Sequence, residues 1–163
     1  MIIRRAREED FKQMWPIFKE VVSKGDSYVF SPDTKEEEGF SFWFGEGITS
    51  YVAEENNKIL GMYKLIKNQR DLGSHVANAS FMVSPDHQGK GIGKAMGLHC
   101  LQEAKKAGFK AIQFNFVVST NTPAVHLWES LGFKIVGTLP KAFNHMKLGL
   151  VDAYVMYRFL DDI

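Results

Sequence analysis

The chain has 163 residues, of which 45% are hydrophobic and 24% are charged, as in ordinary globular domains. Its formal net charge of +1 argues against a strongly basic surface for nucleic acid or an anionic membrane. The single cysteine, Cys100, excludes an internal disulfide and a paired-cysteine metal site. No apolar run approaches the roughly 18 residues of a membrane span, and no leader-like segment opens the sequence. We therefore expect one cytoplasmic domain over residues 1–163, with no bound metal.

The first half of the chain predicts a strand, two helices and three further strands. Residues 2–5 read as a short strand, and hydrophobic residues then recur at helical spacing from 11 to 22. Pro16 lies inside that pattern and should kink the helix or delay its start. The remaining elements are a helix at 35–44 and strands at 50–54, 59–67 and 75–83.

The second half predicts two helices and three strands. The first helix runs to about Ala107 and ends at Gly108, and a strand at 112–118 follows, with apolar residues at alternate positions. Thr122 should cap the second helix, which ends at Gly132. The last strands are expected at 133–136 and 153–159, with a loop of about fifteen residues between them, a length typical of functional loops.

The resulting order is β-α-α-β-β-β-α-β-α-β-β. It predicts a mixed α/β fold in which a central sheet of about six to seven strands is flanked by helices.

The most informative segment spans residues 81–93, where a strand gives way to Ser-Pro and then to three alternating glycines. Such spacing lets backbone N–H groups converge at a helix N-terminus, where the helix dipole favours a phosphate. A P-loop is excluded because Gln88 stands at its first glycine position and Ala95 replaces its hydroxyl residue. The dinucleotide fingerprint also fails, because its third glycine is missing. What remains is a Q-x-x-G-x-G pattern completed by Gly91 and Gly93.

This pattern resembles the pyrophosphate loop of the GNAT superfamily of acetyl-coenzyme A-dependent N-acetyltransferases. Residues 118–124, Val-Ser-Thr-Asn-Thr-Pro-Ala, followed by Leu-Trp-Glu-Ser-Leu-Gly-Phe at 127–133, resemble the second motif of that family. The order of elements fits the whole chain, although the likeness at the level of residues covers mainly 81–133. The resemblance implies a GNAT fold, acetyl-CoA as acyl donor without a metal, and direct attack by an amine in a ternary complex.

The resemblance also implies a role for individual positions. Main-chain groups of Phe81, Met82 and Val83 would pair with the pantetheine arm, and the Val83 amide would polarise the acetyl carbonyl. Asn121 would bond the pantetheine or thioester region. The expected coenzyme-binding residues are Phe81, Met82, Val83, Gln88, Gly89, Lys90, Gly91, Ile92, Gly93, Lys94, Asn121 and Trp128.

The proton chemistry departs from the family pattern at Trp128, which stands where many members have tyrosine. An indole N–H has no useful acidity, so Trp128 packs against the coenzyme or in the core. The thiolate would then take its proton from Tyr154, from Tyr28 or from water. A substrate amine with a pKa near about 10 also requires a base. The strands expected beside the acetyl group carry no carboxylate, which leaves His75 as the best titratable candidate.

Two loops, residues 25–32 and 141–147, are expected to flank the acceptor. Their aromatic residues favour a partly apolar pocket, although they would serve equally well to close the core. The predicted acceptor-binding residues are Asp26, Tyr28, Asn78 and Phe143. Small amines, amino-acid-like compounds and protein or peptide amines remain open as acceptors.

Two further expectations concern the chain as a whole. A catalytically silent acyl-CoA sensor, which kept the coenzyme site but lost the acid, is the alternative to an enzyme. Homodimers are common in the family, so the resemblance makes a second copy of this chain a possible partner.

Overall fold

The computed structural model describes residues 1–163 and confirms the mixed α/β architecture. Three short 3₁₀ turns, at Glu8–Asp10, Asp71–Gly73 and Pro85–His87, connect longer elements. None of the helices combines the length and the apolar run that a membrane crossing requires. The helices and strands, in chain order, are β1 (Ile2–Arg5), α1 (Phe11–Ser23), α2 (Glu36–Phe44), β2 (Thr49–Glu55), β3 (Lys58–Lys67), β4 (Val76–Val83), α3 (Ile92–Lys106), β5 (Ala111–Val118), α4 (Thr122–Ser130), β6 (Lys134–His145) and β7 (Gly149–Phe159).

One seven-stranded sheet, in the order β1-β2-β3-β4-β5-β7-β6, separates two hydrophobic layers. Side chains of a strand alternate between its faces, so neighbouring residues of β3 enter different layers. Tyr63 and Leu65 pack in the cluster that contains α3 and α4, whereas Met62 packs in the cluster of α1 and α2. The sheet therefore has an α3–α4 side and an α1–α2 side.

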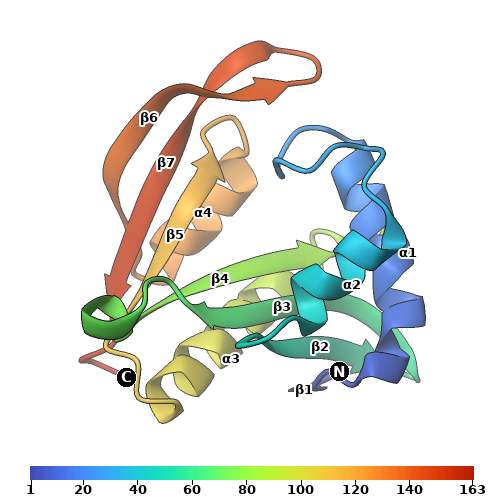
Figure 1. Cartoon of the computed structure of the whole chain (residues 1–163), viewed down its shortest axis with the longest axis horizontal. Helices are drawn as coiled ribbons and strands as arrows, with labels where there is room; N and C mark the ends of the chain where they lie inside the picture. Colours follow the sequence, from blue (N-terminus) through green and yellow to red (C-terminus); the bar gives the residue numbers. More distant parts are fainter.

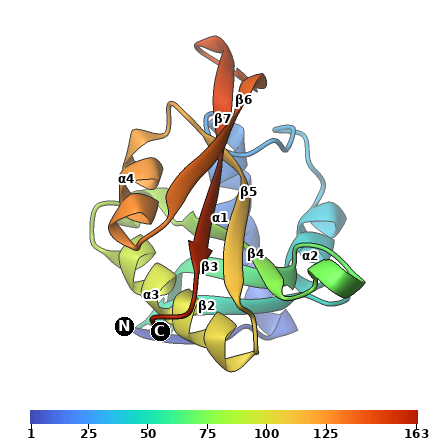
Figure 2. The same cartoon turned by 90° about the vertical axis from the view of Figure 1, so that its left-hand side faces the viewer.

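The feature that positions the site is a split between β4 and β5. These are the only parallel neighbours in the sheet, and their register comprises two residue pairs, Val76 with Ala111 and Ala77 with Ile112. Beyond these pairs the strands diverge, as Figures 1 and 2 show. The later part of β4 consequently has a strand partner on one edge only.

Helix α1 passes through Pro16 without interruption. It begins at Phe11, so the predicted delay of its start is wrong. A proline inside a helix costs about 3 kcal/mol, but burying one large apolar side chain returns about 1.5–3 kcal/mol. The buried side chains of α1 include Met14 and Phe18, so tertiary packing outweighs the missing hydrogen bond.

The long loop expected before the last strand is also wrong, because β6 and β7 form one extended hairpin. Only Met146–Leu148 lies between them, as the tip. Most of β6 is exposed, so it lacks the apolar alternation that identifies a strand in sequence. A bulge bends the hairpin where three β6 residues, 140–142, lie opposite Asp152 alone. Lys141 adopts φ +51° there, and its N–H donates to Asp152 Oδ1 at 2.9 Å.

Candidate active site

A cavity of about 630 Å³ occupies the split between β4 and β5. Residues 78–83 of β4 and 114–118 of β5 form two of its walls. Residues 27–30, after α1, line it as well, together with most of the glycine-rich segment and the first turns of α4. The same cavity is therefore bordered by the glycine-rich segment, which is the candidate phosphate-binding site, and by the open edge of β4.

The backbone of β4 presents alternate residues to this cavity. Phe81 N–H donates to Tyr28 Oη at 3.0 Å, and the Tyr28 hydroxyl donates to the Phe81 carbonyl. Phe81 therefore points its backbone groups away from β3, and in an antiparallel pair Val83 must do the same. Met82 faces Met62 in the intervening hydrogen-bonded pair, so its backbone groups are used within the sheet.

This register corrects one prediction and supports another. Met82 cannot offer its main chain to a pantetheine arm, and the Phe81 groups are held by Tyr28. The Val83 edge is free to pair with a ligand that lies along β4 like an extra strand.

The glycine-rich segment leaves room for a close ligand. Gly89 and Gly91 have φ of +77° and +81°, and a Cβ placed on either would meet no atom within 4 Å. Ala95 N–H is the first amide bonded within α3, to the Gly91 carbonyl at 3.0 Å, and no side chain caps the helix. The amides of the first turn, Ile92–Lys94, therefore lack helical partners beside the cavity.

At the start of α4 the cap is Asn121 rather than the predicted Thr122, because Pro123 occupies the second helical position. The Asn121 side chain makes no capping bond, so its amide remains available to the cavity that it lines.

Trp128 combines both expected packing roles. Its ring lines the cavity and also belongs to the α3–α4 core, with centroids 4.7 Å from both Phe81 and Phe114.

Most of the positions predicted from sequence meet at this cavity. Lys90 is exposed and does not line it, and neither Asp26 nor Phe143 does so. Phe143 is buried behind the wall, with its ring 6.2 Å from that of Phe116. The predicted residues that line the cavity are Tyr28, Asn78, Phe81, Met82, Val83, Gln88, Gly89, Gly91, Ile92, Gly93, Lys94, Asn121 and Trp128.

The two remaining catalytic candidates lie elsewhere. His75 is exposed just before Val76, at the end where β4 and β5 still pair, whereas the cavity opens further along β4. Tyr154 is on β7, between Val117 and Thr138 in the sheet, and does not line the cavity. Neither side chain therefore reaches the cavity wall at which the predicted coenzyme-binding residues meet.

Several lining residues had not been assigned to the site, notably Asn115, Phe116 and His87. The register of β5 shifts between Phe114 and Val117, and this bulge breaks the alternation that had placed 112, 114, 116 and 118 on one face. Asn115 donates to Asn68 Oδ1 at 2.7 Å and accepts from Gln113 at 2.8 Å, which fixes its amide. His87 is close in sequence to the glycines, which is the signal that could have identified it.

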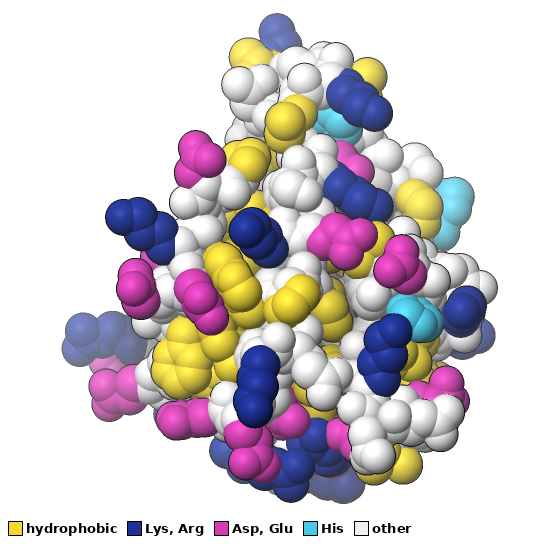
Figure 3. Space-filling model, turned by 90° about the vertical axis from the view of Figure 1, so that its right-hand side faces the viewer, with side chains coloured by type: hydrophobic (Ala, Val, Ile, Leu, Met, Phe, Trp, Pro, Cys, Tyr) yellow, Lys and Arg dark blue, Asp and Glu magenta, His cyan; other side chains and the backbone are white.

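The cavity is poor in charge. No carboxylate lines it, and its titratable side chains are Tyr28, His87 and Lys94. Burial raises the pKa of Tyr28, despite the hydrogen bond to the Phe81 carbonyl. Outside the cavity, Figure 3 shows acidic, basic and hydrophobic side chains interspersed over the α1 side of the molecule.

One buried cation stands behind the acceptor side of the wall. Lys64 of β3 pairs with Ser80 of β4, and its Nζ donates to the Phe42 carbonyl at 2.9 Å. The same nitrogen stands 3.3 Å from the centroid of the Phe42 ring, with no carboxylate as a partner. Burial lowers the pKa of Lys64 to about 8.

The sequence model of the acetyltransferase (GNAT) family matches residues 8–133. The chain belongs to this family. The match contains the glycine-rich segment, the diverging strands β4 and β5, and all of α4.

A solved GCN5-related N-acetyltransferase from Kribbella flavida is 40% identical, with a TM-score of 0.92 over 97% of this chain and 96% of that one. The structure of yncA, a putative acetyltransferase from Salmonella typhimurium with its cofactor acetyl-CoA, is 24% identical. Its TM-score is 0.87 over 100% of this chain and 95% of that one, which shows the same fold.

Two curated relatives extend the comparison. N-acetyltransferase aca1 of Schizosaccharomyces pombe is 38% identical over 62% of this chain and 49% of its own length. The L-amino acid N-acyltransferase MnaT of Escherichia coli is 29% identical over 86% of this chain and 84% of its own length. The chain thus spans about half of the first relative and most of the second.

Proposed function

We propose that this GNAT protein transfers the acetyl group of acetyl-CoA to the primary amine of a small, amino-acid-like acceptor by direct attack in a ternary complex. The observation that carries the proposal is the free Val83 edge of β4, which faces the same cavity as the unpartnered amides of α3.

The donor fits the cavity in two places. The amides of Gly89–Lys94 would hold the pyrophosphate, because the helix N-terminus supplies unpaired donors and the glycines allow close approach. The pantetheine arm would lie along β4 at Val83, with the Asn121 amide beside it. The Val83 N–H would polarise the acetyl carbonyl, a task for which a fixed backbone donor is well suited.

The acceptor would occupy the α1–α2 side of the cavity. The polar side chains there include amides and hydroxyls, those of Ser27, Asn78, Ser80 and Asn115. They can orient an amine, a carboxylate or a water, whereas an ammonium would find no carboxylate partner. Burial in such surroundings favours the neutral, nucleophilic form of the amine. The similarity to MnaT, an L-amino acid N-acyltransferase, supports an acceptor of this class.

Solvent would accept the proton that the amine loses as the amide forms, and would supply the proton that the departing thiolate takes. Trp128 has no acidic proton, and Tyr28 is the only phenol that lines the cavity. Its raised pKa and its bond to Phe81 make Tyr28 a poor acid. Because the cavity offers no free phenol as the acid, the silent acyl-CoA sensor stays the second candidate.

Thiol release from acetyl-CoA, measured with a panel of amino acids and of amines that lack the carboxylate, separates these functions. We expect amine-stimulated release together with an N-acetyl product seen by mass spectrometry. The Asn115→Ala variant should lose acceptor affinity, while His75→Ala, outside the cavity, should behave like the parent. Coenzyme binding without any stimulated release would favour the sensor.

A further inference from the structure

The tip of the β6–β7 hairpin is bonded to the segment that follows α1. Met146 N–H donates to the Gly25 carbonyl at 3.1 Å. Gly25 immediately precedes the cavity-lining residues 27–30, while the hairpin extends from the sheet beside β5, the opposite wall. Figure 1 shows the hairpin bending toward this segment above the split. One contact therefore connects the two walls on the α1 side.

The contact is built around the absence of a side chain at Gly25. This residue is buried and has φ +60°, and a Cβ placed on it would lie 1.9 Å from Met146 Sδ. The thioether thus lies directly on the Gly25 backbone. Met146 is nevertheless 62% exposed, so it covers the segment from outside rather than belonging to the core.

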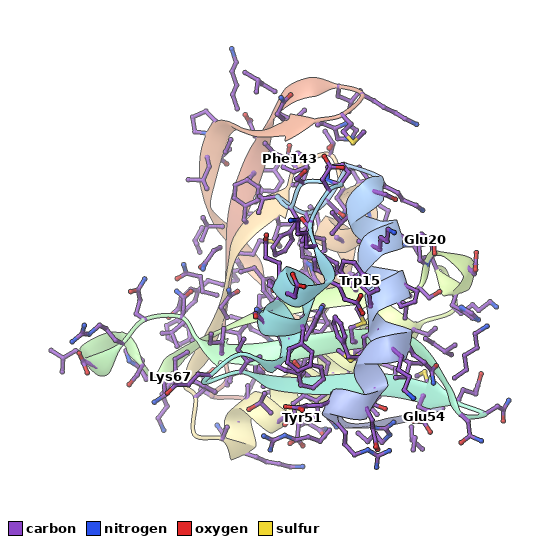
Figure 4. All side chains as sticks on the ribbon, turned by 45° about the vertical axis from the view of Figure 1, so that its right-hand side comes forward. Trp15, Glu20, Tyr51, Glu54, Lys67 and Phe143 are labelled. Atoms are coloured by element: carbon purple, nitrogen blue, oxygen red, sulfur yellow. The ribbon has the colours of Figure 1, made fainter.

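Three further interactions hold the tip in this place. His145 Nδ1 accepts from the N–H groups of Lys147 and Leu148, at 3.1 Å each, which fixes the turn. Phe143, labelled in Figure 4, anchors the hairpin against Phe116 of the cavity wall. At the bulge, the Asp152 carboxylate accepts from Lys141 and fixes the bend.

We propose that the Gly25–Met146 contact is a latch that limits acceptors to molecules small enough to lie wholly beneath it. This inference rests on the proposed function and specifies its substrate class. In this proposal, an amine carried on a polypeptide would leave the cavity between residues 27–30 and the hairpin, and the latch spans that gap. A free amino acid needs no such path. The latch therefore excludes peptide and protein amines.

The test compares the kcat/KM of a free amino acid with that of peptides which begin with the same residue. Met146→Ala removes the side chain that lies on Gly25, and Gly25→Ala introduces a Cβ that pushes the Met146 side chain away. Leu148→Ala is the matched control, because Leu148 belongs to the same tip and is also 62% exposed, whereas the atoms nearest the Cβ position of Gly25 all belong to Met146. We expect both latch variants to reduce the preference for the free amino acid by about tenfold, through faster peptide turnover, and the control to keep it.

The outcomes separate the latch from the proposed function. Folded, active Met146→Ala protein with the parent's preference would overturn the latch alone, as would a parent enzyme that prefers peptides. Failure of every amine to stimulate thiol release from the parent would reject both proposals. Hydrogen exchange at the Met146 amide gives a second readout, which should be slow in the parent and faster in Gly25→Ala.

Discussion

At the scale of single residues, the Tyr28 hydroxyl has the most specific role. It forms hydrogen bonds with both backbone groups of Phe81 and so fixes residues 27–30, which line the cavity, to the edge of β4. Tyr28→Phe would leave a donor and an acceptor unpaired. We expect a loss of about 1 kcal/mol in the free energy of unfolding, measured with urea, together with a higher acceptor KM.

Tyr51→Phe provides the control for that substitution. The Tyr51 hydroxyl makes one long bond, 3.3 Å, to the Glu103 carboxylate on the side of the sheet away from the acceptor. Its removal should change the free energy of unfolding by less than about 0.5 kcal/mol. Equal losses in the two variants would contradict the role given to Tyr28.

Lys64 makes stability depend on pH in a defined direction. Its pKa falls from 10.5 to about 8 in the folded chain, because burial disfavours the charged form. Between these values the unfolded chain binds more protons than the folded chain, so stability should rise with pH in this window. Urea unfolding of Lys64→Met should lack that rise.

The matched control lies on the same strand. Lys67 is exposed at the end of β3, where Figure 4 labels it, so Lys67→Met should keep the dependence on pH. If Lys64→Met gained stability with pH as steeply as the parent, Lys64 would not be the buried cation described here.

At the scale of elements, the two ends of α3 make a direct comparison possible. Gly91 precedes the helix and Gly108 follows it; both have positive φ, and neither would place a Cβ within 4 Å of another atom. Alanine at either position should cost about 1 kcal/mol through backbone strain. Only Gly91→Ala should also weaken acetyl-CoA binding, measured by calorimetry, because its Cβ would stand where the pyrophosphate approaches.

The elements themselves could largely be predicted from sequence, with instructive exceptions. The helices after residue 90 were recognised because glycines mark their ends, and Gly108 and Gly132 do adopt positive φ. The outer part of β6 was missed because both of its faces are largely exposed and it carries no periodic signal. The predicted delay of α1 at Pro16 was wrong because the low helix propensity of proline is outweighed by the burial of the apolar side chains of α1.

For the whole molecule, the glycine-rich loop and the order of elements were sufficient to predict the family, and most of the predicted positions line one cavity. The contacts that decide which backbone groups are free to bind a ligand, and which segments enclose the cavity, join residues that are far apart in the sequence. The bond from Phe81 to Tyr28 requires the register of β3 with β4, and the approach of Met146 to Gly25 requires a bent hairpin. No local pattern in the sequence contains either contact.

We propose that acetyl-CoA binds in the split between β4 and β5 and that its acetyl group meets the acceptor there. A crystal structure with the coenzyme tests this most directly. We predict that the pantetheine arm lies along β4, hydrogen-bonded to the backbone of Val83, with the pyrophosphate on the amides of Gly89–Lys94. A coenzyme bound outside this split, or within it but without a hydrogen bond to Val83, would rule out the proposed mode of acetyl-CoA binding.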